Sequence, residues 1–350
     1  MRIAKAVATL SALVVAAGLT VTGAPAQEAS AAAKAPVDVR VGTYNVRSVS
    51  LDRTAGEERP WKERRPGIIA NITGENLDVL GVQEVNPSKA FKSRLVTGKN
   101  QYQDLRAGLN AAGGSFALTN AYAFNCKKPS TQYRCKKRDR GASHAERILY
   151  NTRTLTLVSQ GKLKYKGQSG STSPNYLAWA VLRTNAGGQE FLFTTTHLAP
   201  KDEAARAAQW AEMISYINSI KGSRPVIVTG DFNTHKHKPL AKRFLPAMEA
   251  AGYGDALGQR AGEYTLSAPR AQSRVNTWMN TANHMDRNVK NWSFWFKPEK
   301  PGNNIDWIFA SNSLPVVEYK VVANYDPSTM TVNGVIPSDH NMVRATITLS

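Results

Sequence analysis

The chain has 350 residues, which is enough for one large hydrophobic core or two modest domains. Its 45 lysine and arginine residues outnumber 26 aspartate and glutamate residues, so the formal net charge is +19. This charge predicts attraction to polyanions, either nucleic acid or an acidic membrane surface, although it also suits a protein that is simply a soluble cation. Beyond residue 31 no uninterrupted apolar stretch has the length of a membrane span, which excludes a bilayer-crossing helix from that part of the sequence.

The first 31 residues have the pattern of a secretory signal peptide. Arg2 and Lys5 form a short basic start, residues 6–22 are apolar, and small residues at 24–26 and 29–31 offer cleavage near residue 26 or residue 31. Small and polar residues follow the apolar stretch, which favours a cleaved signal over a retained anchor. The sequence therefore predicts a secreted, extracellular protein. Residues 36–350 are expected to form one domain, because they show no internal repeat and no long low-complexity linker.

Strand patterns recur along this domain, and helical patterns lie between the earlier ones. Strands are expected at 37–46, 77–85, 146–151, 177–184, 190–198, 224–233, 305–311, 317–325 and 340–349. A short helix is expected around Ile68 and Ile72, and a longer one over 202–220. Residues 225–230 show no polar alternation, which is typical of a strand buried on both faces. The first and last strands alternate, which suits a sheet with one more polar face or an edge. The interleaving predicts α/β layers around a mixed sheet or a pair of sheets.

Residues 126–140, here called the basic loop, concentrate positive charge between and after the two cysteines. The even cysteine count in an exported protein favours a Cys126–Cys135 disulfide, with two free thiols or half of a metal site as the alternatives. The basic residues expected to contact a phosphate backbone are Lys127, Lys128, Arg134, Lys136, Lys137 and Arg138. One acid, Asp139, accompanies them. A loop this basic resembles a phosphate-tracking surface more than an ordinary solvated face.

Polar side chains stand at the ends of most of the predicted strands. They are Asn45, Glu84, His197, Asp231, Asn233, Asp306, Asp339 and His340. Each of them alone is ordinary, because strand ends commonly close with Asp or Asn that bond their own backbone. The occurrence of all of them at strand ends is harder to explain unless they form a functional site. Burying several carboxylates at one sheet edge costs free energy unless they are paired or hold a cation.

The motifs "TYNV", "QEV", "ERILYN", "THL", "GDFN", "IDWIF" and "SDHNMV", in this order, resemble the endonuclease/exonuclease/phosphatase superfamily, typified by pancreatic deoxyribonuclease. The resemblance runs from about residue 38 to residue 349. It implies a four-layer α/β sandwich, with two packed mixed β-sheets flanked by helices and an active site at one end of the sheets. It also implies hydrolysis of phosphodiesters or phosphomonoesters assisted by a divalent metal.

Phosphate ester hydrolysis explains these residue types. A hard cation neutralises the phosphate oxygens, and oxygen ligands suit Mg²⁺, with Mn²⁺ or Ca²⁺ as alternatives. Glu84 is the first expected ligand, with Asn45 beside it and Asp339 as a further one. The resemblance implies that Asp306 orients His340 as an acid–base pair.

The remaining roles also follow from the resemblance. His197 matches the second histidine of the family, and Glu146 matches the carboxylate that holds this histidine in the deoxyribonuclease branch. Asp231 is expected to position the attacking water and Asn233 to donate to a phosphate oxygen. Whether an aspartate or a histidine is the general base stays open.

Several other residues carry weaker signals. His235 and His237 form an H-x-H pair that could touch a metal, but an exposed basic loop is the more ordinary explanation. His144 lies two residues before Glu146 and could contact substrate, and His284 has no pattern around it. Residues 292–296 hold four aromatic side chains, of which part is expected in the core. The rest could form a stacking platform for bases or a membrane wedge.

The sequence leaves three activities open on this fold. A secreted nuclease acting on DNA or RNA accounts best for the basic loop and the overall charge. A sphingomyelinase-type phospholipid phosphodiesterase would account for the signal and the aromatic segment. An inositol-phosphate phosphatase is less favoured, since no phosphoinositide-recognition motif is visible. A non-enzymatic binding protein would be expected to have lost catalytic positions. The expected partner is nucleic acid, or membrane lipid in the second case, with no obligate protein partner implied.

Overall fold

The computed structural model describes residues 34–120, 143–168, 174–293, 295, 297 and 299–350, and of residues 129–131 and 134–135 the backbone alone. Residues 34–350 form one compact unit. The expected signal peptide (1–31) lies outside the described residues, as does most of the basic loop. Among the described residues, no helix combines the length and the apolar character needed to cross a bilayer.

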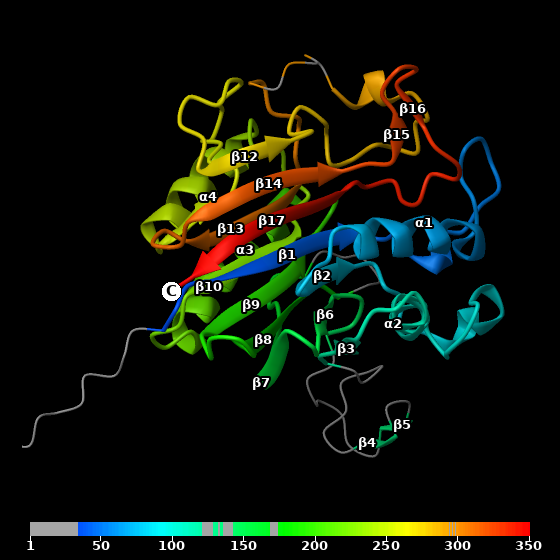
Figure 1. The fold of residues 1–350 in the computed structure, drawn as a ribbon, viewed down its shortest axis with the longest axis horizontal. Helices are drawn as coiled ribbons and strands as arrows, with labels where there is room; N and C mark the ends of the chain where they lie inside the picture. Colours follow the sequence, from blue (N-terminus) through cyan, green and yellow to red (C-terminus); the bar gives the residue numbers. More distant parts are fainter. Residues whose placement is uncertain are drawn as a thin grey trace, which may run out of the picture. The chain divides into compact units, whose positions relative to one another are not determined.

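Two large mixed sheets form the centre of this unit (Figure 1). The seven-stranded sheet has the spatial order β12-β14-β17-β1-β2-β6-β3. Its strands are β1 (Val37–Asn45), β2 (Val79–Gln83), β3 (Phe116–Leu118), β6 (Arg147–Asn151), β12 (Ala271–Val275), β14 (Val316–Val322) and β17 (Met342–Leu349). The six-stranded sheet has the order β11-β13-β10-β9-β8-β7. Its strands are β7 (Leu155–Lys164), β8 (Tyr176–Thr184), β9 (Glu190–His197), β10 (Val226–Asp231), β11 (Tyr253–Asp255) and β13 (Asp306–Ser311).

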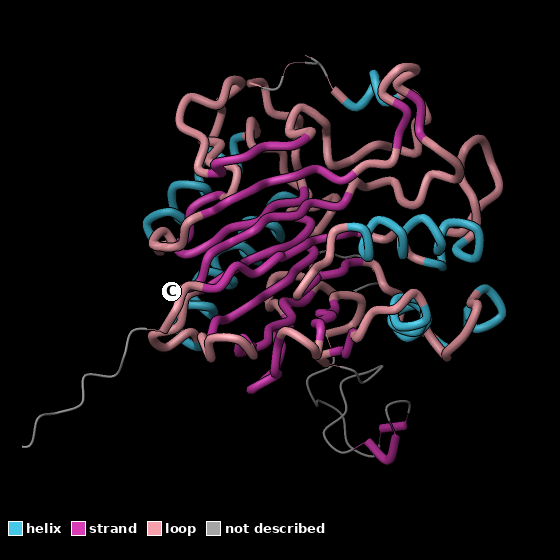
Figure 2. Tube along the Cα trace, viewed as in Figure 1, coloured by secondary structure: helices cyan, strands magenta, loops and turns pink. Residues whose placement is uncertain are grey.

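Helices cover the outer faces of both sheets (Figures 1 and 2). Helices α1 (Trp61–Gly74) and α2 (Gln101–Ala111) share a buried apolar cluster with β1, β2 and β6. Helices α3 (Glu203–Ile220) and α4 (Pro239–Ala250) share another with β8, β9, β10 and β13. The largest cluster joins side chains of both sheets to each other. The layers are therefore helix, sheet, sheet and helix, which confirms the fold class expected from the sequence.

Short elements complete the described part of the chain. Two small two-stranded sheets pair β4 (Pro129–Thr131) with β5 (Arg134–Cys135) and β15 (Tyr325–Asp326) with β16 (Thr331–Val332). The 3₁₀ helices are η1 (Val49–Leu51), η2 (Lys89–Arg94) and η3 (Val289–Trp292).

The buried-strand pattern of residues 225–230 and the helical pattern of residues 202–220 correspond to β10 and α3 in the structure. All six residues of β10 are buried, because this strand lies between β9 and β13 and has packed layers on both faces. Helix α3 begins where the Asp202 side chain accepts a hydrogen bond from the Ala205 backbone N–H, 2.9 Å away, and it buries Trp210, Met213 and Ile217 on one face. Together these elements fix the strand that carries Asp231.

Other expectations differ from the structure. Strands β1 and β17 lie in the interior of the seven-stranded sheet, so their alternation reflects one more polar face and not an edge. Helix α2 was not anticipated, although Tyr102, Leu105 and Leu109 recur at helical spacing, because the polar residues Gln101, Gln103 and Asp104 lie among them and are buried too. Strand β7 was missed because it is the edge strand of its sheet, where five of its ten residues are exposed and Leu155 alone is buried.

Candidate active site

Three strands of the six-stranded sheet bring polar residues together at one end of the sandwich. His197 and Asp231 are the last residues of the parallel strands β9 and β10, and they lie in register. Strand β13 runs antiparallel to β10, so its first residue, Asp306, also lies in register with Asp231. Strand direction alone therefore gathers an imidazole and two carboxylates at one edge.

The seven-stranded sheet adds its polar residues at the same end. Asn45 ends β1, and Glu84 directly follows β2, which runs parallel to β1. Ser338 Oγ donates to the Asn45 carbonyl oxygen, 2.7 Å away, and so fixes the segment before β17 beside the end of β1. This segment carries Asp339 and His340. Five strand ends and one loop thus meet between the two sheets.

The buried carboxylate of Asp231 is the centre of this cluster. Its Oδ2 atom accepts a hydrogen bond from Asn45 Nδ2 at 3.1 Å and lies 3.4 Å from His197 Nε2 and 3.8 Å from His340 Nε2. Its Oδ1 atom accepts the backbone N–H of Asn233 at 2.9 Å. Asn233 has a φ of 48°, in the left-handed region that few residues other than glycine adopt. The turn after β10 is therefore held by the carboxylate that ends the strand.

His340 pairs with the buried Asp306, and its own side chain is 12% exposed. His340 Nδ1 lies 2.8 Å from Asp306 Oδ2, which leaves Nε2 facing Asp231. Burial alone would lower the pKa of His340, but the carboxylates of Asp306 and Asp231 raise it well above the ordinary histidine value. Burial also raises the pKa of Asp306, and the imidazole opposes this shift. The predicted pairing of these two residues is present, whereas its catalytic role stays a prediction.

Glu84 contributes a further carboxylate, on the seven-stranded sheet side of the site. Its φ of 62° is left-handed, and its two oxygens accept from Asn45 Nδ2 at 3.1 Å and from the Ser48 backbone N–H at 2.9 Å. The Asn45 amide therefore bridges Glu84 and Asp231 through its nitrogen, while its oxygen accepts the Arg47 backbone N–H at 3.0 Å. Strain of this kind is often found at functional sites.

Arg47 was missed by the sequence reasoning, although it follows Asn45 by two residues. Its guanidinium donates to the Asp339 carboxylate and lies 3.2 Å from Glu58 Oε1. Burial alone would raise the pKa of Asp339, but His340 and Arg47 hold it below the ordinary value. The expected metal ligand Asp339 is thus ion-paired. The three groups that converge within 4.8 Å in the described residues are Asp231, Asp306 and His340.

Glu146 does not hold His197 in the way the resemblance implied. No hydrogen bond between Glu146 and His197 occurs in the described part of the chain, where His197 contacts Asp231 instead. Glu146 is buried, its Oε2 has no partner among the described residues, and burial raises its pKa well above the ordinary value. The neighbouring His144 stacks on Tyr176, and burial lowers its pKa to about 4. Burial therefore favours the protonated form of Glu146.

Asn233 is oriented by the neighbouring strand. Its Nδ2 donates to the Leu198 carbonyl oxygen at 2.9 Å, at the end of β9. An asparagine amide carries two N–H groups, so one remains for the predicted contact with a phosphate oxygen.

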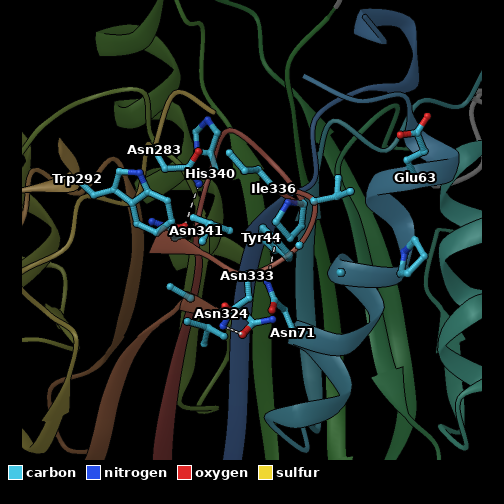
Figure 3. A pocket seen from close by; sticks show the side chains of 18 residues that line it. Tyr44, Glu63, Asn71, Asn283, Trp292, Asn324, Asn333, Ile336, His340 and Asn341 are labelled. Atoms are coloured by element: carbon cyan, nitrogen blue, oxygen red, sulfur yellow. Dashed lines mark hydrogen bonds between the residues drawn. The ribbon is translucent and has the colours of Figure 1, made fainter. Parts of the chain in front are cut away.

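A cavity of about 250 Å³ lies beside His340 (Figure 3). Trp292 and Asn283 lie near His340 in this view, whereas Glu63 lies across the cavity on α1. Trp292 is buried, and its Nε1 donates to the Asp286 carbonyl oxygen at 2.9 Å. The expectation that part of the aromatic segment belongs to the core is confirmed for Trp292.

The predicted nucleic-acid contacts lie almost wholly outside the described residues. Of the basic loop, Lys127, Lys128, Lys136, Lys137, Arg138 and Cys126 are not described, and Arg134 and Cys135 are described by their backbone in β5. The expected Cys126–Cys135 disulfide and the phosphate-tracking role of the loop therefore stay predictions.

The fold and the site define an α/β sandwich protein with an acid–base cluster at one end of its two sheets. The chain belongs to the Endonuclease/Exonuclease/phosphatase family, which it matches over residues 42–340. It is 26% identical to nocturnin of Drosophila melanogaster over 268 residues, which is 69% of this chain and 38% of that protein.

Solved structures show the same fold at low sequence identity. A mannosyl-6-phosphatase of Bacteroides thetaiotaomicron has a TM-score of 0.61 and 18% identity, covering 88% of this chain and 99% of its own. Danio rerio TDP2, complexed with a single-strand DNA product, has a TM-score of 0.53 and 15% identity, covering 89% and 98%.

Proposed function

We propose that the protein is a metal-dependent phosphodiesterase whose substrate is nucleic acid, that is, a nuclease. The observation that carries the proposal is the convergence of Asn45, His197 and His340 on one oxygen of Asp231. Such a cluster supplies an acceptor for a proton and several donors to a phosphate within one site. The family membership supports hydrolysis of a phosphate ester.

The donor set fits a divalent cation. Glu84 and Asp231 offer carboxylate oxygens on either side of the Asn45 amide, and neither carboxylate has a direct ion pair with a lysine or arginine among the described residues. Oxygen ligands of this kind suit Mg²⁺ or Mn²⁺. Glu84 and Asp231 would hold the ion, with Asn45 after rotation of its amide. When bound, the ion would neutralise phosphate charge and assist the leaving group.

The proton transfers belong to the protein's own side chains. Asp306 fixes the His340 ring by its contact with Nδ1, so that Nε2 is the atom that exchanges a proton in the site. Asp231 orients the attacking water, and His197 Nε2 donates to the phosphate. The Asn233 N–H that does not contact Leu198 is available to the same phosphate.

Nucleic acid is favoured over the other phosphate esters by charge. The chain carries a formal net charge of +19, which attracts a polyanion far more strongly than a zwitterionic lipid or a small phosphomonoester. A family fold bound to a single-strand DNA product, as in the TDP2 structure, supports the same substrate class. We also propose that the protein is secreted, on the strength of residues 1–31.

The test compares four substrates with one purified protein. Plasmid DNA, a single-stranded RNA, sphingomyelin vesicles and an inositol phosphate are incubated with Mg²⁺ or with EDTA. We expect hydrolysis of nucleic acid with Mg²⁺ and its loss in EDTA. Asp231→Asn should abolish this activity, whereas Asp326→Asn, at a half-buried aspartate in β15, should not. Preferred hydrolysis of sphingomyelin or of the inositol phosphate would overturn the nuclease assignment.

A further inference from the structure

A second cavity, of about 530 Å³, lies between the loop after β10 and the segment before β13. Its size is within the range of roughly 300–1,000 Å³ that is typical of ligand sites. His235 and Asn303 line it. His235 is four residues beyond Asp231, and Asn303 is three residues before Asp306, so the chain leads directly from the cavity to both carboxylates. Four extended residues span at most about 14 Å, which places the cavity next to the candidate active site.

A buried ion pair turns the two histidines of the loop toward this cavity. Lys236, between them, has a side chain that is 1% exposed, and its Nζ lies 2.8 Å from Asp255 Oδ1. Its ammonium also lies 5.4 Å from the centre of the Trp307 ring in the core. Because Lys236 points inward, His235 and His237 on either side of it line the cavity. The H-x-H spacing therefore places both imidazoles at the same cavity, which the sequence alone did not show.

Aromatic rings form much of the cavity wall and are open to solvent. His237 and Tyr264 stack with their centroids 3.9 Å apart and an interplanar angle of 1°. Tyr264 is 55% exposed, and Trp295, which also lines the cavity, is 46% exposed. These rings are not core residues, since a core ring would be covered. Their exposure beside an active site is the arrangement expected of a stacking platform.

The two imidazoles lie with their Nδ1 atoms covered by the protein. Nδ1 of His235 and Nδ1 of His237 are both inaccessible to solvent and have no hydrogen-bond partner among the described residues. Burial lowers the pKa of both side chains, which favours the neutral form of each ring. Because their Nδ1 atoms are covered, the two rings contribute surface to the cavity wall and not a hydrogen bond from Nδ1.

We propose that this cavity is a subsite for one nucleobase of the substrate strand, which stacks on Trp295 and on the Tyr264–His237 pair. The proposal rests on the nuclease function proposed above and assigns it a single-stranded substrate at this point. The phosphate that adjoins this base lies toward Asp231. Lys300, whose Nζ is 4.1 Å from the Trp295 ring centre, adds positive charge for the backbone. A concave, lysine-flanked ring wall suits a base better than a lipid surface, which would require a protruding apolar wedge.

The test uses a single-stranded oligonucleotide and its copy with one abasic residue at a defined position. We expect the wild-type KM to be about 5- to 100-fold lower for the intact strand, the effect of one stacked base, with little change in kcat. Trp295→Leu should remove this difference, and Trp295→Phe, which keeps a ring, should retain most of it. Val158→Ser, at an exposed position on β7, is the matched control and should leave the difference intact.

A binding measurement tests the base subsite independently of the nuclease activity. In the Asp231→Asn background, the intact strand should quench the fluorescence of Trp295 and the abasic copy should not, whether or not the wild type hydrolyses either strand. Equal hydrolysis and equal binding of the two strands would overturn the subsite while leaving the nuclease assignment standing. If Trp295→Leu weakened binding to sphingomyelin vesicles and not to DNA, the subsite would be refuted in favour of a membrane contact.

Discussion

The ion pair of Lys236 and Asp255 offers a quantitative test, because it anchors the loop that carries Asn233 and the base subsite. We consider Asp255→Asn, which removes one charge and keeps the shape. Burial lowers the pKa of Lys236, and Asp255 opposes this shift. The variant therefore leaves a buried ammonium without its counter-ion, a change that typically costs about 3–5 kcal/mol.

Deprotonation of Lys236 sets an upper limit on this loss of folding free energy. Lysine can escape the unpaired state by releasing its proton, which from an ordinary pKa of about 10.4 costs about 4.6 kcal/mol at pH 7 and about 1.9 kcal/mol at pH 9. The folded-state pKa of Lys236 lies below the unfolded one, so the unfolded chain binds more protons between the two values. The free energy of unfolding of the variant should therefore rise with pH across this window, relative to wild type.

Urea unfolding at pH 7 and pH 9 measures this difference. We expect Asp255→Asn to lose about 3–4.6 kcal/mol at pH 7 and less than about 2 kcal/mol at pH 9. Adding Lys236→Met should recover part of the loss at pH 7, since the unpaired charge is gone. Glu63→Gln, which breaks the exposed Arg59–Glu63 contact of 3.9 Å, is the surface control and should change stability by less than about 1 kcal/mol. A loss that is equal at both pH values would refute the reasoning.

Three further predictions concern the site. Mg²⁺ should raise the Tm of the wild type and raise that of Glu84→Gln much less, because Glu84 is an expected ligand; calorimetry without substrate measures both. His340→Ala and His197→Ala should each lower kcat about 10²–10⁴-fold in steady-state assays, and near wild-type turnover would reassign the histidine as structural. Replacing the four lysines of the basic loop by glutamine should flatten the salt dependence of DNA binding, and an unchanged slope would contradict the phosphate-tracking role.

The sequence was most informative about the candidate site residues that lie at the ends of regular strands. Asp231 and His197 could be placed together because each ends an apolar run, and neighbouring strand ends meet at one edge of a sheet. The pairing of His340 with Asp306 needed the family resemblance, since 34 residues separate them. The expected contact of Glu146 with His197 was wrong, because side-chain orientation at the start of β6 depends on packing that no local pattern records.

The features that the sequence did not reveal depend on contacts between distant segments. Arg47 looks like any surface arginine until the segment before β17 brings Asp339 to it, 292 residues away. The sequence of the loop after β10 suggests an exposed basic loop, because nothing local shows that Lys236 pairs with Asp255 or that His237 and Trp295 line one cavity. Long-range contacts of this kind decide the direction of a side chain, and the local periodicity does not contain them.

The charge balance of the site links these observations to metal binding. Glu84, Asp231, Asp306 and Asp339 bring four carboxylates to one end of the sheets, while Arg47 and His340 supply two cationic groups. Acids in excess at partly buried positions repel one another and would raise the free energy of the folded state. A divalent cation near Glu84 and Asp231 would offset that repulsion. The same excess leaves a phosphate no favourable approach without a cation, so metal binding and substrate binding should be coupled in this protein.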